Sequence, residues 1–106
     1  MARSKSHLRI HWYGVDEPQE LNFSGSLADV LGELFAFTVN CQLHWGESSF
    51  MSPAERLREA PRAAKAAAKV VDQAVKQAQK KSRRATGNIP WFGYDPIHYD
   101  LRIAPE

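Results

Sequence analysis

The sequence has only one cysteine, Cys41, in 106 residues. A single cysteine excludes a disulfide within the chain and is typical of a reducing compartment. No catalytic motif surrounds Cys41, so we expect it to be a buried small hydrophobic residue. Long apolar runs are missing too, and so is the apolar core of a secretory signal. We therefore expect no membrane-spanning segment and a cytoplasmic protein.

Motifs for catalysis and cofactor binding are also missing. The chain has no G-x-G-x-x-G, Walker or nucleophile-elbow pattern, and no acid stands in a pattern with a base or nucleophile. Its histidines, His7, His11, His44 and His98, lack the spacing of a zinc motif. Paired strands could bring His11, His44 and His98 together on polar faces, but coincidental exposure is the simpler interpretation. We expect a non-enzymatic protein with no cofactor, no metal and no small-molecule substrate.

What the sequence does contain is segregated charge. The formal net charge is only +2. Residues 53–84 nevertheless carry ten basic side chains against three acids, whereas the rest of the chain carries four basic side chains against nine acids. The ten basic residues are Arg56, Arg58, Arg62, Lys65, Lys69, Lys76, Lys80, Lys81, Arg83 and Arg84. This segregation predicts one strongly positive surface.

Alternation of apolar and polar residues predicts two strands near the N-terminus. Leu8, Ile10 and Trp12 alternate with polar residues, which indicates a half-buried strand over 8–13. A shorter strand is expected at about 19–24. Turn-forming residues lie between the two segments, so the pair is expected to form a hairpin.

The next segment changes from a helical period to a period of two. Ser26 predicts a helix N-cap, and the apolar spacing after it predicts a short helix over 27–34 that Gly32 weakens. From there, strict alternation involves Phe35, Phe37, Val39, Cys41, Leu43 and Trp45. It predicts a long central strand over 35–45. Continuation of the helix is the alternative, because neither glycine nor proline separates the two segments.

A long basic, alanine-rich helix is predicted over 53–84. Ser52 and Glu55 have the spacing of a capping box, and Gly87 is expected to stop the helix. Pro61 either kinks this helix or divides it. One helical stripe is basic and is expected to stay exposed: Arg58, Arg62, Lys65, Lys69, Lys76 and Lys80. A narrow apolar stripe is expected to pack on the sheet: Leu57, Ala64, Val71, Val75 and Ala78.

The C-terminal segment is first aromatic and then alternating. Trp91, Phe92 and Tyr94 are expected to fill one edge of the core; the alternative is that they anchor a partner or stack on bases. A strand is predicted from the alternation of Ile97, Tyr99, Leu101 and Ile103. The order along the chain is then β-β-α-β-α-β. It predicts a single α+β domain over 1–106, with a small, mostly antiparallel sheet and the long basic helix.

Three roles are open to the basic stripe: solvation alone, binding to a protein or a second copy, and binding to nucleic-acid phosphates. We favour a protein partner or self-association, because small residues let helices approach closely and no nucleic-acid recognition motif is present. An accessory factor or inhibitor of a larger machine would fit this description. We expect no membrane partner, because insertion needs bulky apolar residues opposite the lysines. The candidate binding residues are Arg58, Arg62, Lys65, Lys69, Lys76, Lys80, Lys81, Arg83, Arg84, Trp91, Phe92 and Tyr94.

Overall fold

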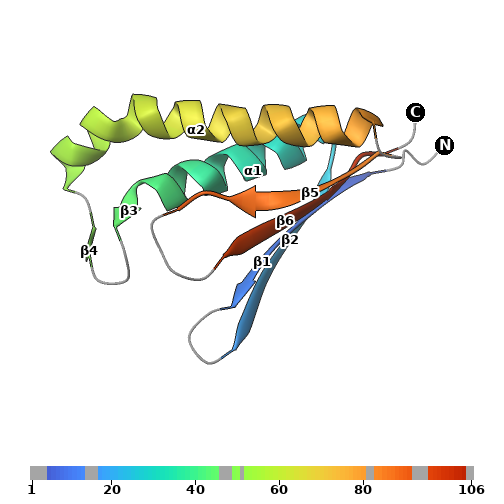
Figure 1. Ribbon diagram of the computed structural model, residues 1–106, viewed down its shortest axis with the longest axis horizontal. Helices are drawn as coiled ribbons and strands as arrows, with labels where there is room; N and C mark the ends of the chain where they lie inside the picture. The colour runs from blue at the N-terminus through green and yellow to red at the C-terminus, as the bar shows by residue number, and fades with distance from the viewer. Residues whose placement is uncertain are drawn as a thin grey trace.

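The computed structural model places two helices on one face of a four-stranded antiparallel sheet (Figure 1). The fold is therefore α+β, as predicted. The sheet has the order β2-β1-β6-β5 and consists of β1 (Ser6–Tyr13), β2 (Pro18–Gly25), β5 (Arg84–Ile89) and β6 (Ile97–Arg102). The structure describes residues 5–13, 17–45, 49–50, 52–80, 83–91 and 96–104.

The helices are α1 (Leu27–Gln42) and α2 (Pro53–Lys80). Between them, the two-residue strands β3 (His44–Trp45) and β4 (Ser49–Phe50) pair with each other and not with the main sheet. Pro61 lies inside α2, so α2 is one helix rather than two. Within the described ranges, no helix combines the length and apolarity needed to cross a membrane.

The predicted N-terminal hairpin and the C-terminal strand are confirmed. Alternate residues of each strand point to opposite faces of the sheet. On the inner face, Leu8 and Ile10 of β1 lie opposite Leu101 and Tyr99 of β6, and all four are buried beneath the helices. The outer face carries the polar residues of the same strands.

The predicted strand over 35–45 is wrong, because α1 continues to Gln42. Its buried residues recur at helical spacing: Val30, Leu34, Thr38, Cys41 and Gln42. The Ser26 hydroxyl caps the helix by accepting a hydrogen bond from the Asp29 N–H at 3.1 Å, and no breaker follows. Phe37 and Cys41 belong to both the alternating pattern and the helical one, so the alternation did not distinguish a strand from a helix.

Cys41 is buried within α1, as predicted. Burial raises the pKa of its thiol to about 11. The side chain is therefore a protonated thiol at neutral pH and packs as a small apolar group.

The fourth strand of the main sheet is β5, which the sequence did not predict. The expected helix over 53–84 ends at Lys80 instead. Arg83 then takes a left-handed backbone conformation (φ 64°) and β5 begins at the next residue. Gly87 does not stop the helix; it lies within β5, opposite Tyr99. A Cβ at Gly87 would lie 2.7 Å from the Tyr99 hydroxyl oxygen, so a larger residue would force the Tyr99 side chain or the strand to shift.

The capping box predicted for α2 is present. The Glu55 N–H donates to the Ser52 hydroxyl, and the Ser52 N–H donates to the Glu55 carboxylate, both at 3.2 Å. These hydrogen bonds hold the pKa of Glu55 below its usual value. Two orphan N–H groups at the start of the helix are thereby satisfied.

The buried face of α2 differs from the predicted apolar stripe. Leu57 was expected to pack on the sheet, yet it is 79% exposed, and Val71 and Val75 are only partly buried. The buried residues are instead Ala63, Ala67, Val70, Ala74 and Ala78. Small side chains at these positions let α2 approach both α1 and the sheet closely. Val70 is buried while Leu57 is exposed, so side-chain size was a poor guide to burial.

Candidate functional site

A shallow groove runs between α2 and the edge strand β5. Its volume is about 350 Å³. We call it the α2 groove, and it is lined by Arg62, Lys65, Ala66, Lys69, Val70 and Gln73 of α2 and by Asn88 and Pro90 at the end of β5. Because an α-helix repeats every 3.6 residues, Lys76 and Lys80 continue the basic face beyond the groove. From Arg62 to Lys80 this face extends about 27 Å at 1.5 Å per residue.

The basic residues of α2 keep most of their charge available. Arg58, Lys65, Lys69 and Lys80 are exposed, and in the described part of the chain none of these four takes part in an ion pair. Among the residues whose positions are described, Lys76 pairs only with Asp72 of its own helix, at 3.0 Å. Exposed pairs of this kind contribute only a few tenths of a kcal/mol and are easily exchanged for another anion.

Gln42 fixes one end of the α2 groove. Its side-chain oxygen accepts a hydrogen bond from Arg62 at 2.7 Å, and its side-chain nitrogen donates to the carbonyl of Pro90 at 2.6 Å. Arg62 also donates to the Gln42 backbone carbonyl and forms an ion pair with Glu59. Gln42 is only 6% exposed, so a buried side chain joins α1, α2 and Pro90 after β5. Sequence reasoning missed Gln42, although helical spacing from Thr38 would have placed it on the buried face.

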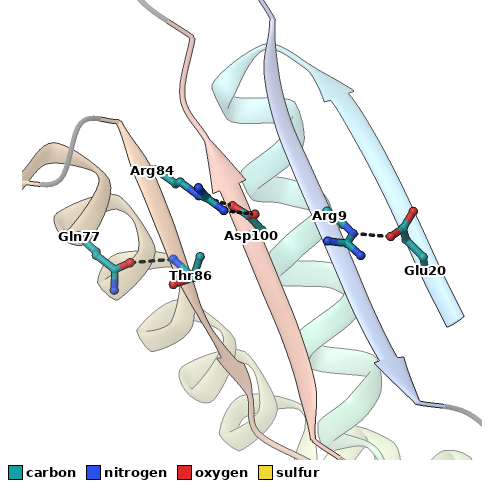
Figure 2. A network of polar contacts seen from close by, with 6 residues as sticks. All are labelled: Arg9, Glu20, Gln77, Arg84, Thr86 and Asp100. Atoms are coloured by element: carbon teal, nitrogen blue, oxygen red, sulfur yellow. Dashed lines mark hydrogen bonds and ion pairs between the residues drawn. The ribbon is translucent and has the colours of Figure 1, made fainter. Parts of the chain in front are cut away.

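The free edge of β5 is partly occupied by α2. The side-chain oxygen of Gln77 accepts a hydrogen bond from the backbone N–H of Thr86 at 2.7 Å (Figure 2). An unpaired edge strand is otherwise a template for another strand. Gln77 therefore occupies the Thr86 N–H, and α2 flanks this edge of the sheet.

The outer face of the sheet is lined by paired charges. Figure 2 shows Arg9 of β1 beside Glu20 of β2, and Arg84 of β5 beside Asp100 of β6. Arg84 holds Asp100 through two hydrogen bonds of 2.9 and 3.2 Å. Arg84 was predicted to belong to the basic helix. The structure places it on the sheet instead, where its charge is balanced.

Two histidines meet on the central strands of this outer face, near one end of the ladder. His11 of β1 lies opposite His98 of β6, with ring centroids 5.3 Å apart. The Nδ1 atom of His98 lies 2.7 Å from the side-chain oxygen of Asn88. His44, which could have joined them, lies in β3, outside this sheet. No group of three metal-ligating side chains occurs among the residues with described positions.

We expect His11 to make stability depend on pH. Partial burial, together with the positive charges of Arg9 and His98, lowers the pKa of His11 below 6.5. The unfolded chain then binds a proton at a higher pH than the folded chain does. The contribution of neutral His11 to stability is fully present above the pKa of the unfolded chain, and it is lost as the pH falls through the pKa of the folded chain. Urea unfolding at pH values of about 7.5 and 5.5 should show a smaller acid-induced loss for His11→Gln than for the wild type; an equal or larger loss would contradict this assignment.

The remaining candidate residues are dispersed. Arg83, in the turn after α2, donates a hydrogen bond to the carbonyl of Ala104 at 3.0 Å. Trp91 is half-buried and packs against the core, as expected for an aromatic at its edge. Lys81, Phe92 and Tyr94 lie outside the described residues.

The chain matches no protein-family model, no curated protein and no solved structure. Its function is therefore inferred from the charge and shape of its own surface.

Proposed function

We propose that the protein binds nucleic acid by placing phosphates along the basic face of α2 and in the α2 groove. The observation that carries this proposal is a linear array of exposed cations whose charge the described acids leave largely uncompensated. Lysines bound to phosphates release condensed counterions, and this release is the main driving force of sequence-independent binding. The binding requires no catalytic step.

The buried face of α2 favours nucleic acid over the protein partner that the sequence first suggested. That suggestion relied on small residues being available for helix packing. Alanines at 63, 67, 74 and 78 are instead buried in the protein's own core. Protein interfaces are depleted in lysine and enriched in aromatic residues at their centres. The exposed side of α2 offers mainly lysine, arginine and glutamine, a composition that suits phosphates better.

A matched pair of charge reversals tests this proposal. Lys65→Glu with Lys69→Glu changes the α2 groove, whereas Lys5→Glu with Arg56→Glu changes the net charge equally at positions that do not line it. Affinity for a labelled oligonucleotide is measured by fluorescence anisotropy between about 50 and 200 mM salt. We expect the groove variant to bind at least about tenfold more weakly than the wild type. The slope of log affinity against log salt concentration should be shallower by about 2.

The control variant should stay within about threefold of the wild type, because distant charges act only through a screened field. Equal weakening of the two variants would mean that net charge, and not the α2 groove, determines binding. Absence of wild-type binding at the lowest salt concentration would overturn the proposal altogether.

Self-association is a second candidate, supported by Leu57. This side chain is 79% exposed, and it lies in the N-terminal part of α2, which reaches past the ends of β5 and β6 (Figure 1). A second copy could bury it. Sedimentation should then show a mass that rises with concentration for the wild type and a monomer for Leu57→Glu. A wild type that stays monomeric throughout would exclude this candidate.

A further inference from the structure

No described helix covers the outer face of the main sheet. Both helices pack on the inner face (Figure 1), and no other described element lies across the outer one. Alternate residues of the four strands therefore point outward, among them His11 and Tyr13 of β1, Asn88 of β5, and His98 and Arg102 of β6. A sheet face this rich in rings, amides and arginines offers several kinds of contact to a ligand.

A hollow at one end of this face gathers the rings. We call it the sheet hollow; its volume is about 520 Å³, within the usual range for ligand sites. His11 and His98 line it as partly exposed rings, and Tyr13 lines it at 61% exposure. Flat rings on an open sheet are the groups on which unpaired bases stack, whatever their sequence.

Asn88 connects the sheet hollow to the α2 groove. Its side-chain oxygen contacts the ring of His98, and the same residue lines the α2 groove beside Lys65 and Lys69. Neighbouring strands lie about 4.8 Å apart, so only about 10 Å separates β1 from β5. A single flexible strand can therefore place bases against β1 and β6 while its phosphates reach α2.

Charge on the outer face does not oppose such a ligand. Glu20 and Asp100 are each held by an arginine. Arg102 is exposed, and within the described ranges it makes no ion pair. The face therefore keeps a positive balance.

We propose that the sheet hollow stacks unpaired bases, so that the ligand is single-stranded nucleic acid whose phosphates follow α2. This inference rests on the proposed function of α2 and adds the class of nucleic acid. A duplex would offer the same phosphates, but its bases are stacked and paired with one another. The rings on the sheet would then have no unpaired base to stack on.

Three probes of equal length test the inference with the wild-type protein. They are a labelled single strand of mixed sequence, the same sequence as a duplex, and an abasic single strand that keeps the phosphates without the bases. We expect the mixed single strand to bind at least about tenfold more tightly than the abasic strand, and more tightly than the duplex. Equal affinity for all three probes, or preference for the duplex, would overturn the inference.

Variants of the rings give an independent test. His11→Ala with Tyr13→Ala should weaken single-strand binding by about tenfold or more while leaving the salt slope and the abasic affinity unchanged. His11→Phe with Tyr13→Phe should restore binding, because phenyl rings also stack. Thr86→Ala, on the same face but outside the hollow, is the control and should bind like the wild type. Circular dichroism checks that every variant is folded.

The results separate the two proposals. If the ring variants bind the single strand as the wild type does, while Lys65→Glu with Lys69→Glu does not, then the sheet hollow has no role and the α2 proposal stands. If no probe binds the wild type, both proposals fail.

Discussion

An alanine in place of Leu34 should lower the free energy of unfolding by about 3 kcal/mol. Leu34 is fully buried on α1, in the cluster that also contains Ile10 of β1 and Leu101 of β6. The truncation removes apolar contacts and leaves a cavity where helix and sheet meet. Domains of this size are stable by only about 5–15 kcal/mol, so the loss is large but leaves the protein folded.

Leu57→Ala makes the same chemical change in α2 and serves as the control. Leu57 is 79% exposed, so its truncation should change the free energy of unfolding by less than about 0.5 kcal/mol. Urea titrations of both variants measure the difference. Similar losses at the two leucines would mean that Leu57 is packed, as the sequence alone suggested, and that the buried face of α2 has been assigned wrongly.

Local signals were enough to predict much of the fold. The strands with alternating residues, the Ser26 cap and the capping box of α2 all depend on residues within a few positions of one another. A strand with one buried face has alternating apolar and polar residues, and this alternation can be recognised in the sequence. The α+β class followed from these elements, because an alternating strand and an amphipathic helix must cover each other's apolar faces.

The two errors in secondary structure have a common cause. Residues 35–42 alternate like a strand, yet they follow a capped helix with no breaker and extend it. Residues 84–89 contain only Ala85 and Ile89 as apolar side chains, yet they form β5 because β6 offers a partner and α2 covers them. In both segments the alternation of apolar and polar residues was a poor guide: the first continues a capped helix, and the second depends on tertiary contacts that its own sequence does not show.

The candidate site could be predicted only in part. The basic face of α2 followed from helical spacing, whereas the meeting of His11 and His98 on the central strands was only the less favoured alternative for these histidines. The role of Asn88 could not be predicted, because it depends on β5 lying beside both β6 and α2. The burial of Gln42 likewise depends on where Arg62 and the segment after β5 lie. A sequence can specify which side chains are charged, whereas a groove forms only when distant segments meet.

Gly87→Ala should destabilise the protein by about 2 kcal/mol, although alanine is usually the better residue within regular structure. The added Cβ would lie 2.7 Å from the hydroxyl oxygen of Tyr99 and 2.8 Å from its ring. Tyr99 is only 5% exposed and belongs to the core cluster, so it cannot move aside without disturbing its neighbours. Because Gly87 pairs with Tyr99, we expect this clash to break part of the pairing between β5 and β6.

Gly32→Ala is the matched substitution with the opposite expected sign. Gly32 lies inside α1, and a Cβ there would meet nothing within 4 Å. Alanine in a helix interior is favoured over glycine by about 1 kcal/mol, so this variant should be more stable than the wild type. Thermal and urea unfolding of the two variants should therefore diverge in opposite directions. A stabilised Gly87→Ala would mean that β5 does not lie against Tyr99, and a destabilised Gly32→Ala would mean that α1 does not continue as a helix through this position.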